Sequence, residues 1–349
     1  MNIINNDINN NKFYSTLYNE CRSNHITAFY DFSFHMLSLF STCTLIYFFK
    51  DVLFFSLPLT FILGLLHMKS FVCFHDCGHN SYTPSKKLNQ YLGTFLGIIT
   101  LNPFSWNFNH NTHHITSGNR NNKYNYKFNE TVFHTVEEYN SWSCIKKKTY
   151  RVLMHPITFL FVLSPFKMIF FMRFNAFRFL FKKKSVDYSN FYIFCENIIN
   201  NFGIYMMLRT FIYYEILLYF MMSYLITSAI GVSLFHNQHT YNPEPYIVSN
   251  NDEWNQQDSG VKGSSFIQIP WFFTYFTAGI EYHHIHHMNS KIPSYNLPKY
   301  HNAVVNSSNI FDNIKKLTIK ECYYNLWLKL YDEDNNRYVT FNEIDRPPQ

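Results

Sequence analysis

Histidines are the residues of this sequence best suited to chemistry, and their spacing is unusual. The chain of 349 residues has 17 histidines, and most of them fall in four short stretches. These are "HDCGH" with His75 and His79, "HNTHH" with His110, His113 and His114, "HNQH" with His236 and His239, and "HHIHH" with His283, His284, His286 and His287. Residues three or four positions apart share one face of a helix. The pattern HxxHH, which occurs twice, therefore predicts histidines that face a common site.

Clusters of this kind indicate metal binding. Imidazole suits iron, copper, zinc and nickel, and one ion takes about four to six ligands. Eight or nine clustered histidines therefore predict a site for two metals. The HExxH signature of zinc proteases is absent, as is the paired Glu-x-x-His arrangement of soluble di-iron bundles. A lone histidine on an apolar face is usually a core residue, but the repeated pattern favours a nitrogen-rich dinuclear centre.

Long apolar segments must position these histidines. Aromatic residues make up 20% of the chain and charged residues only 15%, whereas about a quarter of the residues in soluble domains are charged. The apolar run 52–74 would be about 35 Å long as a helix, enough to cross a bilayer core of about 30 Å. Only Lys50 and Asp51 separate it from the run 33–49, so the two runs predict a membrane hairpin. The alternative is a pair of buried helices in a soluble protein.

Two more spans are expected at about 190–210 and 213–236. Segments 88–101 and 153–180 are expected to be interfacial or re-entrant. The first is too short to span, and lysines flank the second on both sides, against the positive-inside bias for a full crossing. All four histidine stretches can then meet on the cytoplasmic face. The sequence thus predicts an all-α polytopic membrane protein with about four transmembrane helices, interfacial helices and a cytoplasmic cap carrying the histidines.

Three regions are expected along the chain. Residues 1–30 are rich in asparagine and predicted to be disordered, residues 31–310 form the membrane domain, and residues 311–349 form a cytoplasmic tail, disordered after about residue 332. The seven cysteines include no CxxC pair, so neither a zinc ribbon nor a disulfide framework is indicated. The lysine clusters are expected to face lipid headgroups, and nucleic acid binding has no other support.

The histidine stretches resemble a known family. "HDCGH", "HNTHH" and "HHIHH" resemble the three histidine boxes of the membrane fatty-acid desaturases. The similarity extends into "HHITSGN" (113–119), "TVEEY" (135–139), "GSSF" (263–266) and "YHHIHHMNSKIPSYNL" (282–297), and covers about residues 30–300. These flanks look most like the omega-6 (delta-12) acyl-lipid branch rather than the acyl-CoA delta-9 branch.

The resemblance implies a di-iron centre and its ligands. The residues at matching positions are His75, His79, His110, His113, His114, His283, His286 and His287, with His239 as a further ligand. His236 is a less secure match, because relatives often lack a histidine there. His284 lies off the HxxHH face, so a supporting part is expected for it. Asp76 and Glu281 are expected to orient imidazoles by accepting their free N–H groups. For Asp76 the alternative is a solvated or helix-end carboxylate.

The resemblance also implies the reaction. It is the O2-dependent introduction of a cis double bond into an acyl chain, held as an acyl lipid or acyl-CoA, with delta-12 desaturation of oleoyl as the expected outcome. The chain has "HPIT" at 155–158 in place of the "HPGG" haem signature of fused cytochrome domains, so a separate b-type cytochrome or ferredoxin is expected as donor. The expected location is the endoplasmic reticulum if the source is eukaryotic.

Other readings of the same residues are open. A fatty-acid hydroxylase, an acetylenase or a sphingolipid desaturase would use a similar site, and product analysis separates these outcomes where histidine spacing does not. A non-catalytic metal-binding membrane protein would place ionisable residues along a pathway inside its spans. Arg209 and Glu215 are the candidates near the middle of the apolar run 202–235, and a turn at the far interface explains them.

Overall fold

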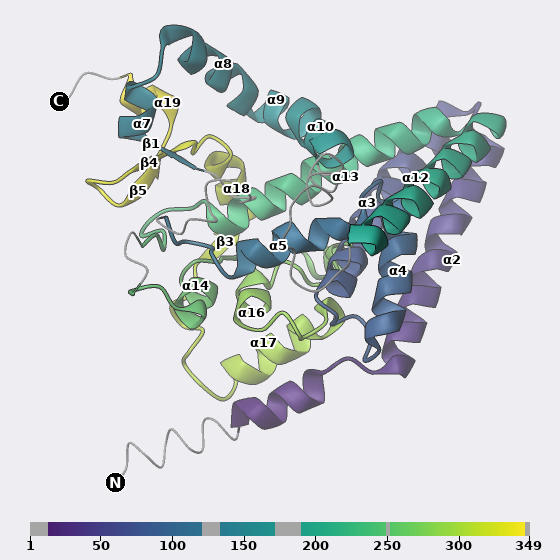
Figure 1. Ribbon diagram of the computed structural model, residues 1–349, viewed down its shortest axis with the longest axis horizontal. Helices are drawn as coiled ribbons and strands as arrows, with labels where there is room; N and C mark the ends of the chain where they lie inside the picture. The colour runs from purple at the N-terminus through teal and green to yellow at the C-terminus, as the bar shows by residue number, and fades with distance from the viewer. Residues whose placement is uncertain (1–12, 121–132, 172–189, 249–251, 346–349) are drawn as a thin grey trace.

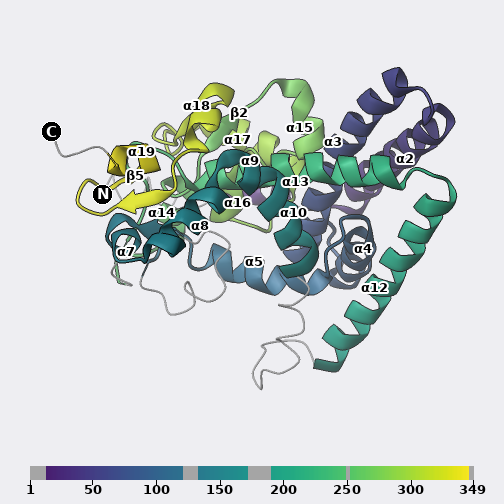
Figure 2. The same cartoon turned by 90° about the horizontal axis from the view of Figure 1, so that it is seen from above.

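The computed structural model describes residues 13–120, 133–171, 190–248 and 252–345. The chain is mostly helical, and its long helices gather at one side of the molecule, away from a cap of short helices and strands (Figures 1 and 2). Three helices are long and apolar enough to cross a membrane: α2 (His25–Phe49), α3 (Leu53–Gly78) and α13 (Leu217–His239). The expected polytopic helical architecture is therefore confirmed.

A fourth crossing depends on a bent helix pair. Helix α8 (Cys144–Met154) is followed by a helical stretch, Pro156–Phe170, at a bend of 66°. Pro156 and Pro165 lie in the first two positions of short helical turns, because proline lacks the N–H that a helix interior uses. The turns are α9 (Pro156–Thr158), η2 (Phe159–Leu163), α10 (Ser164–Phe166) and η3 (Lys167–Phe171). The pair is either a broken span or a re-entrant loop, and residues 172–180 of the expected segment lie outside the described residues.

Helix α12 (Asn190–Tyr213) lies where a span was expected at 190–210, and its crossing of the membrane stays a prediction. Helix α4 (Lys86–Ile99) overlaps the segment 88–101 that is expected to be interfacial. It is capped by Ser85, whose hydroxyl accepts the N–H of Leu88. It packs against α3 and α12. A glycine at 97 permits this approach, because a Cβ there would lie 3.0 Å from Nδ2 of Asn200 on α12 and 3.4 Å from Cε2 of Phe74 on α3.

Helices α3 and α13 run side by side and carry histidines at the same end. A Cβ at Gly64 would lie 2.8 Å from Cγ2 of Ile226, so the two backbones approach closely there. The hydroxyl of Thr227 donates a hydrogen bond to the carbonyl of Gly64 at 2.7 Å. This contact fixes the positions of the two helix ends from which the site begins.

The cap lies beyond those ends. Its helical elements are η1 (Phe104–Trp106), α5 (Asn107–His114), α7 (Val136–Asn140), α14 (Gln256–Val261), η4 (Trp271–Phe273), α15 (Thr274–Thr277), α16 (His283–Met288), η5 (Ser294–Asn296), α17 (Leu297–Val305), α18 (Ile319–Asn325) and α19 (Phe341–Ile344). An apolar cluster that includes Ile285, Leu297 and Phe311 forms its interior.

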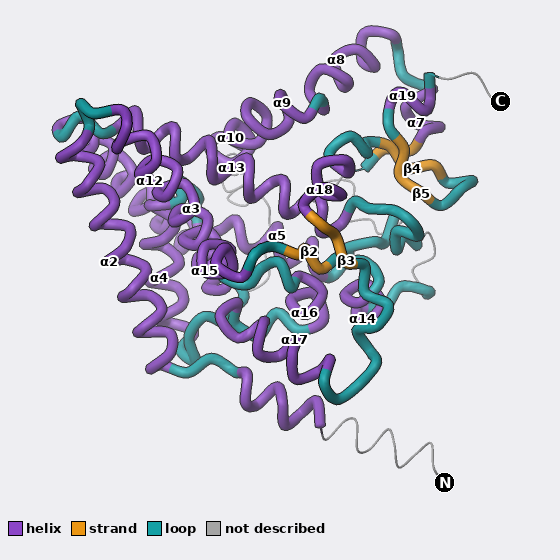
Figure 3. The backbone as a smooth tube through the Cα atoms, turned by 180° about the vertical axis from the view of Figure 1, so that it is seen from behind, coloured by secondary structure: helices purple, strands orange, loops and turns teal. Residues whose placement is uncertain are grey.

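Two small sheets, which the all-α expectation lacked, close the cap (Figure 3). Strand β2 (Phe266–Gln268) pairs in parallel with β3 (Lys316–Thr318). Strand β4 (Leu330–Asp332) lies between β1 (His134–Thr135), with which it is parallel, and β5 (Arg337–Val339), with which it is antiparallel. Cross-strand pairing with a distant segment is invisible to local patterning.

Both ends of the chain are more ordered than expected. Residues 13–21 are helical and α2 begins at His25, so the disorder predicted for 1–30 is wrong for residues 13–30, while residues 1–12 lie outside the described part. The side chain of Asn24 caps α2 by accepting the N–H of Thr27 at 2.7 Å. Disorder after residue 332 is also wrong up to residue 345, because β5 and α19 are formed there.

Candidate metal centre

Four helices deliver the histidines to one place. His75 and His79 lie at the carboxyl end of α3, and His239 is the last residue of α13. The second box forms α5 and the third forms α16, so both HxxHH stretches are helical as expected. The short helices α5 and α16 approach the ends of the long ones from the cap side (Figure 1).

The first group has five histidines whose ligand nitrogens lie within 4.8 Å of one another: His75, His79, His110, His114 and His286. All five are buried. The Nε2 atom of His110 lies 2.8 Å from that of His75 and 3.0 Å from that of His114. The Nε2 atom of His114 is also 3.0 Å from that of His286. Nitrogens from three separate helices thus converge on one point.

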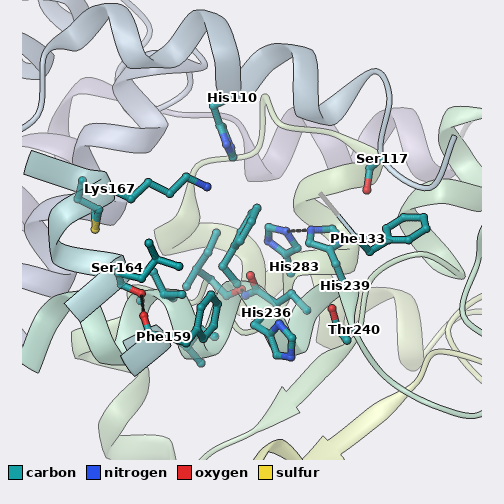
Figure 4. Close-up of a pocket in the computed structure, with 18 of the residues that line it drawn as sticks. His110, Ser117, Phe133, Phe159, Ser164, Lys167, His236, His239, Thr240 and His283 are labelled. Carbon is teal, nitrogen blue, oxygen red and sulfur yellow. Dashed lines mark hydrogen bonds between the residues drawn. The ribbon is translucent and has the colours of Figure 1, made fainter. Parts of the chain in front are cut away.

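The second group has four histidines, again within 4.8 Å: His113, His239, His283 and His287. The Nε2 atom of His239 lies 3.0 Å from that of His283 (Figure 4). It lies 3.2 Å from the Nε2 atom of His113. The two groups are adjacent, since the ring centres of His114 and His287 are 4.3 Å apart. All nine histidines predicted as ligands therefore belong to one of two neighbouring groups.

Each HxxHH stretch serves both groups. His110 and His114 join the first group and His113 joins the second, while His283 and His287 join the second and His286 joins the first. Residues four apart stay together, and the residue offset by three goes to the other group. A common face was expected for each stretch, but each supplies a pair to one group and a single residue to its neighbour.

Burial favours the neutral form of five of these imidazoles. Loss of water around them is the largest cause that lowers the pKa of His110, His114, His283, His286 and His287 well below the usual value for histidine. A neutral imidazole offers the lone pair that a metal needs. Both ring nitrogens of His287 have no hydrogen-bond partner among the described residues. Orphaned buried nitrogens of this kind are costly unless an ion binds them.

The spacing of the nitrogens fits metal ions. Metal–imidazole bonds of about 2.0–2.1 Å, the lengths known for zinc, place two neighbouring ligand nitrogens about 3 Å apart when they meet at a right angle. The closest nitrogen separations in both groups are 2.8–3.2 Å. Four or five nitrogens and no thiolate in each group match the ligand set that intermediate transition metals accept. The two groups are thus able to hold one metal ion each.

Two carboxylates expected to orient imidazoles behave differently. Asp76 accepts the N–H of Ser294 at 2.6 Å and has its other oxygen 3.3 Å from Nδ1 of His75. It therefore ties the first box to the segment after the third. Glu281 instead accepts the hydroxyl of Thr277 at 2.6 Å, and its remaining oxygen has no hydrogen-bond partner among the described residues. The expected contact between Glu281 and an imidazole is not formed.

The two remaining histidines of the stretches lie outside both groups. His236 donates its Nε2–H to the carbonyl of Asn325 at 2.9 Å. His284 points away from the metal groups and pairs with Nδ1 of His301 at 3.1 Å, beside the ring of Phe311. His284 is therefore part of the cap interior, in line with its place off the HxxHH face.

One contact that orients a histidine was not predicted from the sequence. The Nδ1–H of His239 donates to the carbonyl oxygen of Gly263 at 3.0 Å, which leaves Nε2 of His239 free to face the second group. Gly263 opens the "GSSF" stretch. The only signal available was that stretch itself, because a backbone carbonyl carries no residue-specific mark.

A cavity of about 360 Å³ adjoins both groups (Figure 4). Histidines of the first group (His75 and His110) and of the second (His239 and His283) form part of its wall. Much of the remaining wall is apolar and comes from α3, α13 and the bent segment, including Met68, Val72, Phe159, Leu163 and Phe235. A hydrocarbon chain can be held here beside the metal groups, with water excluded.

Known proteins are similar to this chain in sequence. The family described as fatty acid desaturase matches residues 53–308. A fatty acid desaturase of Bacillus subtilis is 31% identical over 301 residues, which cover 84% of this chain and 79% of that protein. An sn-1 oleoyl-lipid 12-desaturase of a Picosynechococcus species is 26% identical over 296 residues, covering 82% of this chain and 79% of the relative. An sn-1 acyl-lipid omega-3 desaturase (ferredoxin) of Synechocystis is 42% identical over 59 residues, 17% of this chain and 16% of that relative.

These matches agree with the site. The matched region includes every histidine of the two groups, and long apolar helices carry them to the wall of an apolar cavity. The chain belongs to the membrane fatty acid desaturases and is an oxidoreductase that acts on fatty acyl chains.

Proposed function

We propose that the chain introduces a cis double bond at the delta-12 position of an oleoyl chain, using two iron ions. The observation that carries the proposal is the pair of adjacent histidine groups at the wall of an apolar cavity. Delta-12 placement is supported by the flanking stretches and by the similarity to an oleoyl-lipid 12-desaturase along 82% of the chain.

The chain's own residues bind and orient the reactants. One iron would be held by His75, His79, His110, His114 and His286, and the other by His113, His239, His283 and His287. Bound iron supplies the oxidising power, with O2 as co-substrate, that removes hydrogen from an unactivated methylene. Two adjacent methylene groups lose two hydrogens, and with two electrons and two protons O2 leaves as two waters. The apolar wall holds the acyl chain and keeps bulk water away from the reacting carbons.

The remaining partners follow the expectations from the sequence. The substrate is an acyl lipid or acyl-CoA. A separate b-type cytochrome or ferredoxin delivers the electrons, and relatives whose names include ferredoxin support the second choice. The histidine groups are placed on the cytoplasmic side of the membrane, which would be the endoplasmic reticulum in a eukaryotic source.

Fatty-acid profiling tests the reaction and its position together. The chain is expressed in a yeast without delta-12 activity, and products are identified by gas chromatography–mass spectrometry with double-bond location. A new 18:2 species is expected with the wild type and with His25→Ala, which changes an exposed histidine, but not with His113→Ala. A hydroxylated or acetylenic product, or a double bond elsewhere, would contradict the delta-12 assignment. No product from an iron-loaded protein, with either donor supplied, would contradict the proposed reaction on acyl chains.

A further inference from the structure

One charged side chain in the cavity is not used by the proposed chemistry. Lys329 comes directly before β4 and lines the cavity with its neighbour Leu328. It is only 7% exposed, and its Nζ has no hydrogen-bond partner among the described residues. Its Nζ lies 4.3 Å from the centre of the Phe159 ring, and Phe159 also lines the cavity. A buried ammonium with only an aromatic face beside it is poorly compensated.

A second buried lysine shows what compensation looks like in this protein. Lys69, on α3, is 3% exposed and has its Nζ 2.7 Å from Oδ1 of Asp31. These two are the buried lysines of the described residues. Lys69 has a carboxylate at hydrogen-bond distance, and Lys329 has none among the described residues. Burial accordingly lowers the pKa of Lys329 to about 7, which reports a charge that lacks a counter-ion.

The wall of the cavity is cationic and apolar. Lys167 also lines it, and its side chain extends into the cavity (Figure 4). None of the described residues that line the cavity is an aspartate or a glutamate. A buried lysine with no described hydrogen-bond partner, in a wall with no described carboxylate and much apolar surface, complements a ligand that combines a hydrocarbon chain with an anion.

Two hydrogen bonds fix the backbone at Lys329, and this fixes the direction in which its side chain leaves the backbone. Its N–H donates to the carbonyl of Val339 across the β4–β5 pair at 3.0 Å. Its carbonyl accepts the hydroxyl of Tyr150 at 3.3 Å. Both neighbours belong to elements that enclose the cavity, and a side chain on so fixed a backbone is preorganised for a ligand.

We infer that Lys329 is a binding residue for an anionic oxygen group carried by the acyl substrate, either a carboxylate or a phosphate. The inference rests on the proposed acyl-chain chemistry and makes it more specific. The C-terminal segment then selects the acyl carrier by its charge, while the apolar wall accepts the hydrocarbon. A neutral ester of the same chain loses this contact and binds more weakly.

Matched ligands test the inference without turnover. Affinities of the purified full chain in detergent are measured for oleate against methyl oleate, and for 1-oleoyl lysophosphatidic acid against monoolein. We expect the anionic member of at least one pair to bind about tenfold more tightly to the wild type, the size of a hydrogen bond to a charged group. Lys329→Met and Lys329→Gln should abolish this preference, and Lys329→Arg should retain most of it. Lys320→Met, at an exposed lysine on α18, should leave it unchanged.

The outcomes separate the ligands. Loss of preference for oleate alone assigns a free carboxylate, and loss for the phosphate alone assigns a phospholipid carrier. A preference that survives in both neutral variants, or equal weakening of charged and neutral ligands, overturns the inference. Melting temperatures identify a variant that misfolds, and the second neutral variant then decides. A wild type that prefers anions but yields no unsaturated product would sink the proposed reaction and leave the anion site standing.

Discussion

At the scale of single residues, His283 and His284 are adjacent in the chain but have different surroundings. His283 belongs to the second metal group, whereas His284 pairs with His301 in the cap interior. We expect His283→Ala to lower the iron content of the purified protein by about one ion per chain. His284→Ala should keep its iron and lose about 1–3 kcal/mol of stability, because it removes a buried side chain and leaves the half-buried His301 without this hydrogen bond. Iron analysis and thermal melting check both outcomes, and equal iron loss in the two variants would contradict the division.

Asp76 offers a second test at this scale. Its carboxylate accepts the N–H of Ser294 and faces Nδ1 of His75. Asp76→Asn keeps the size of the side chain but removes its charge. Partners of this kind typically change metal affinity or activity by about 10–100-fold. Iron retention under graded chelator should fall by that factor, while Asp312→Asn, at an exposed carboxylate, should match the wild type. Unchanged retention in Asp76→Asn would show that this carboxylate does not support the first group.

At the scale of elements, the close contact between α3 and α13 sets the positions of the helix ends that carry histidines. A side chain at Gly64 would meet Cγ2 of Ile226 at 2.8 Å, whereas one at Gly231 would meet only Sδ of Met68 at 3.4 Å. Gly64→Ala should therefore lower stability by about 1–3 kcal/mol through overpacking. Gly231→Ala makes an ordinary contact and should gain from the better helix propensity of alanine. Thermal melting in detergent compares the two, and the opposite order would show that the helices are not held at Gly64.

The C-terminal elements are anchored by an ion pair. The Arg151 guanidinium donates to both oxygens of Asp345 at 2.6 and 2.7 Å and holds the pKa of that carboxyl below its usual value. A lowered carboxyl pKa stabilises the folded state above the unfolded pKa of about 3.9, and this contribution is lost as the pH falls through the folded pKa. Both partners are partly exposed, so the contribution is below about 1 kcal/mol.

Hydrogen exchange of β4, β5 and α19 measures that anchor. Protection in the wild type should be the same at pH 6 and pH 8 after correction for intrinsic rates, since neither pH reaches the carboxyl pKa. Arg151→Met and Asp345→Asn should each weaken protection several-fold. Arg337 pairs with Glu343, and both residues belong to the C-terminal segment itself. Arg337→Met therefore tests a contact within this segment, whereas Arg151→Met tests the contact between the segment and α8. A marked change of protection between pH 6 and pH 8 would exclude the ion pair as the cause.

At the scale of the whole molecule, metal ions should hold the four histidine-bearing helices together. Ions that bind only the folded chain stabilise it by mass action, about 2.7 kcal/mol per site at a hundredfold excess over Kd. Chelation should therefore lower the melting temperature, and Fe²⁺ should restore it. Mg²⁺, which prefers oxygen ligands, should not. An equal melting temperature with and without Fe²⁺ would argue against ions at the two groups.

The sequence predicted much of this site because helical spacing is local information. All nine predicted histidines gather, since i, i+4 residues share a helix face and the apolar runs fix which ends meet. The division of each HxxHH stretch between two groups depends on where α5 and α16 lie, which no local pattern specifies. No local pattern specifies that the carbonyl of Gly263 accepts a hydrogen bond from His239, or that Glu281 accepts the hydroxyl of Thr277.

The C-terminal segment shows most clearly what could not be predicted from the sequence. Its polar residues around 332–337 resemble a disordered tail, yet Tyr331 and Tyr338 pair across β4 and β5, and β4 joins β1 from the middle of the chain. Such pairing is set by tertiary contacts, which outweigh composition. Lys329 acquires its place in the cavity only through this non-local sheet.

Strand β4, which pairs with β1, lies late in the chain, and this position sets an order of events during synthesis. Every histidine of the two metal groups has left the ribosome before Leu330 does, because the last of them is His287. The metal groups can therefore form while one wall of the cavity is still missing. Folding of the C-terminal segment would then enclose a space beside metal groups that are already assembled. The nascent chain could thus bind metal before it is able to hold an acyl chain.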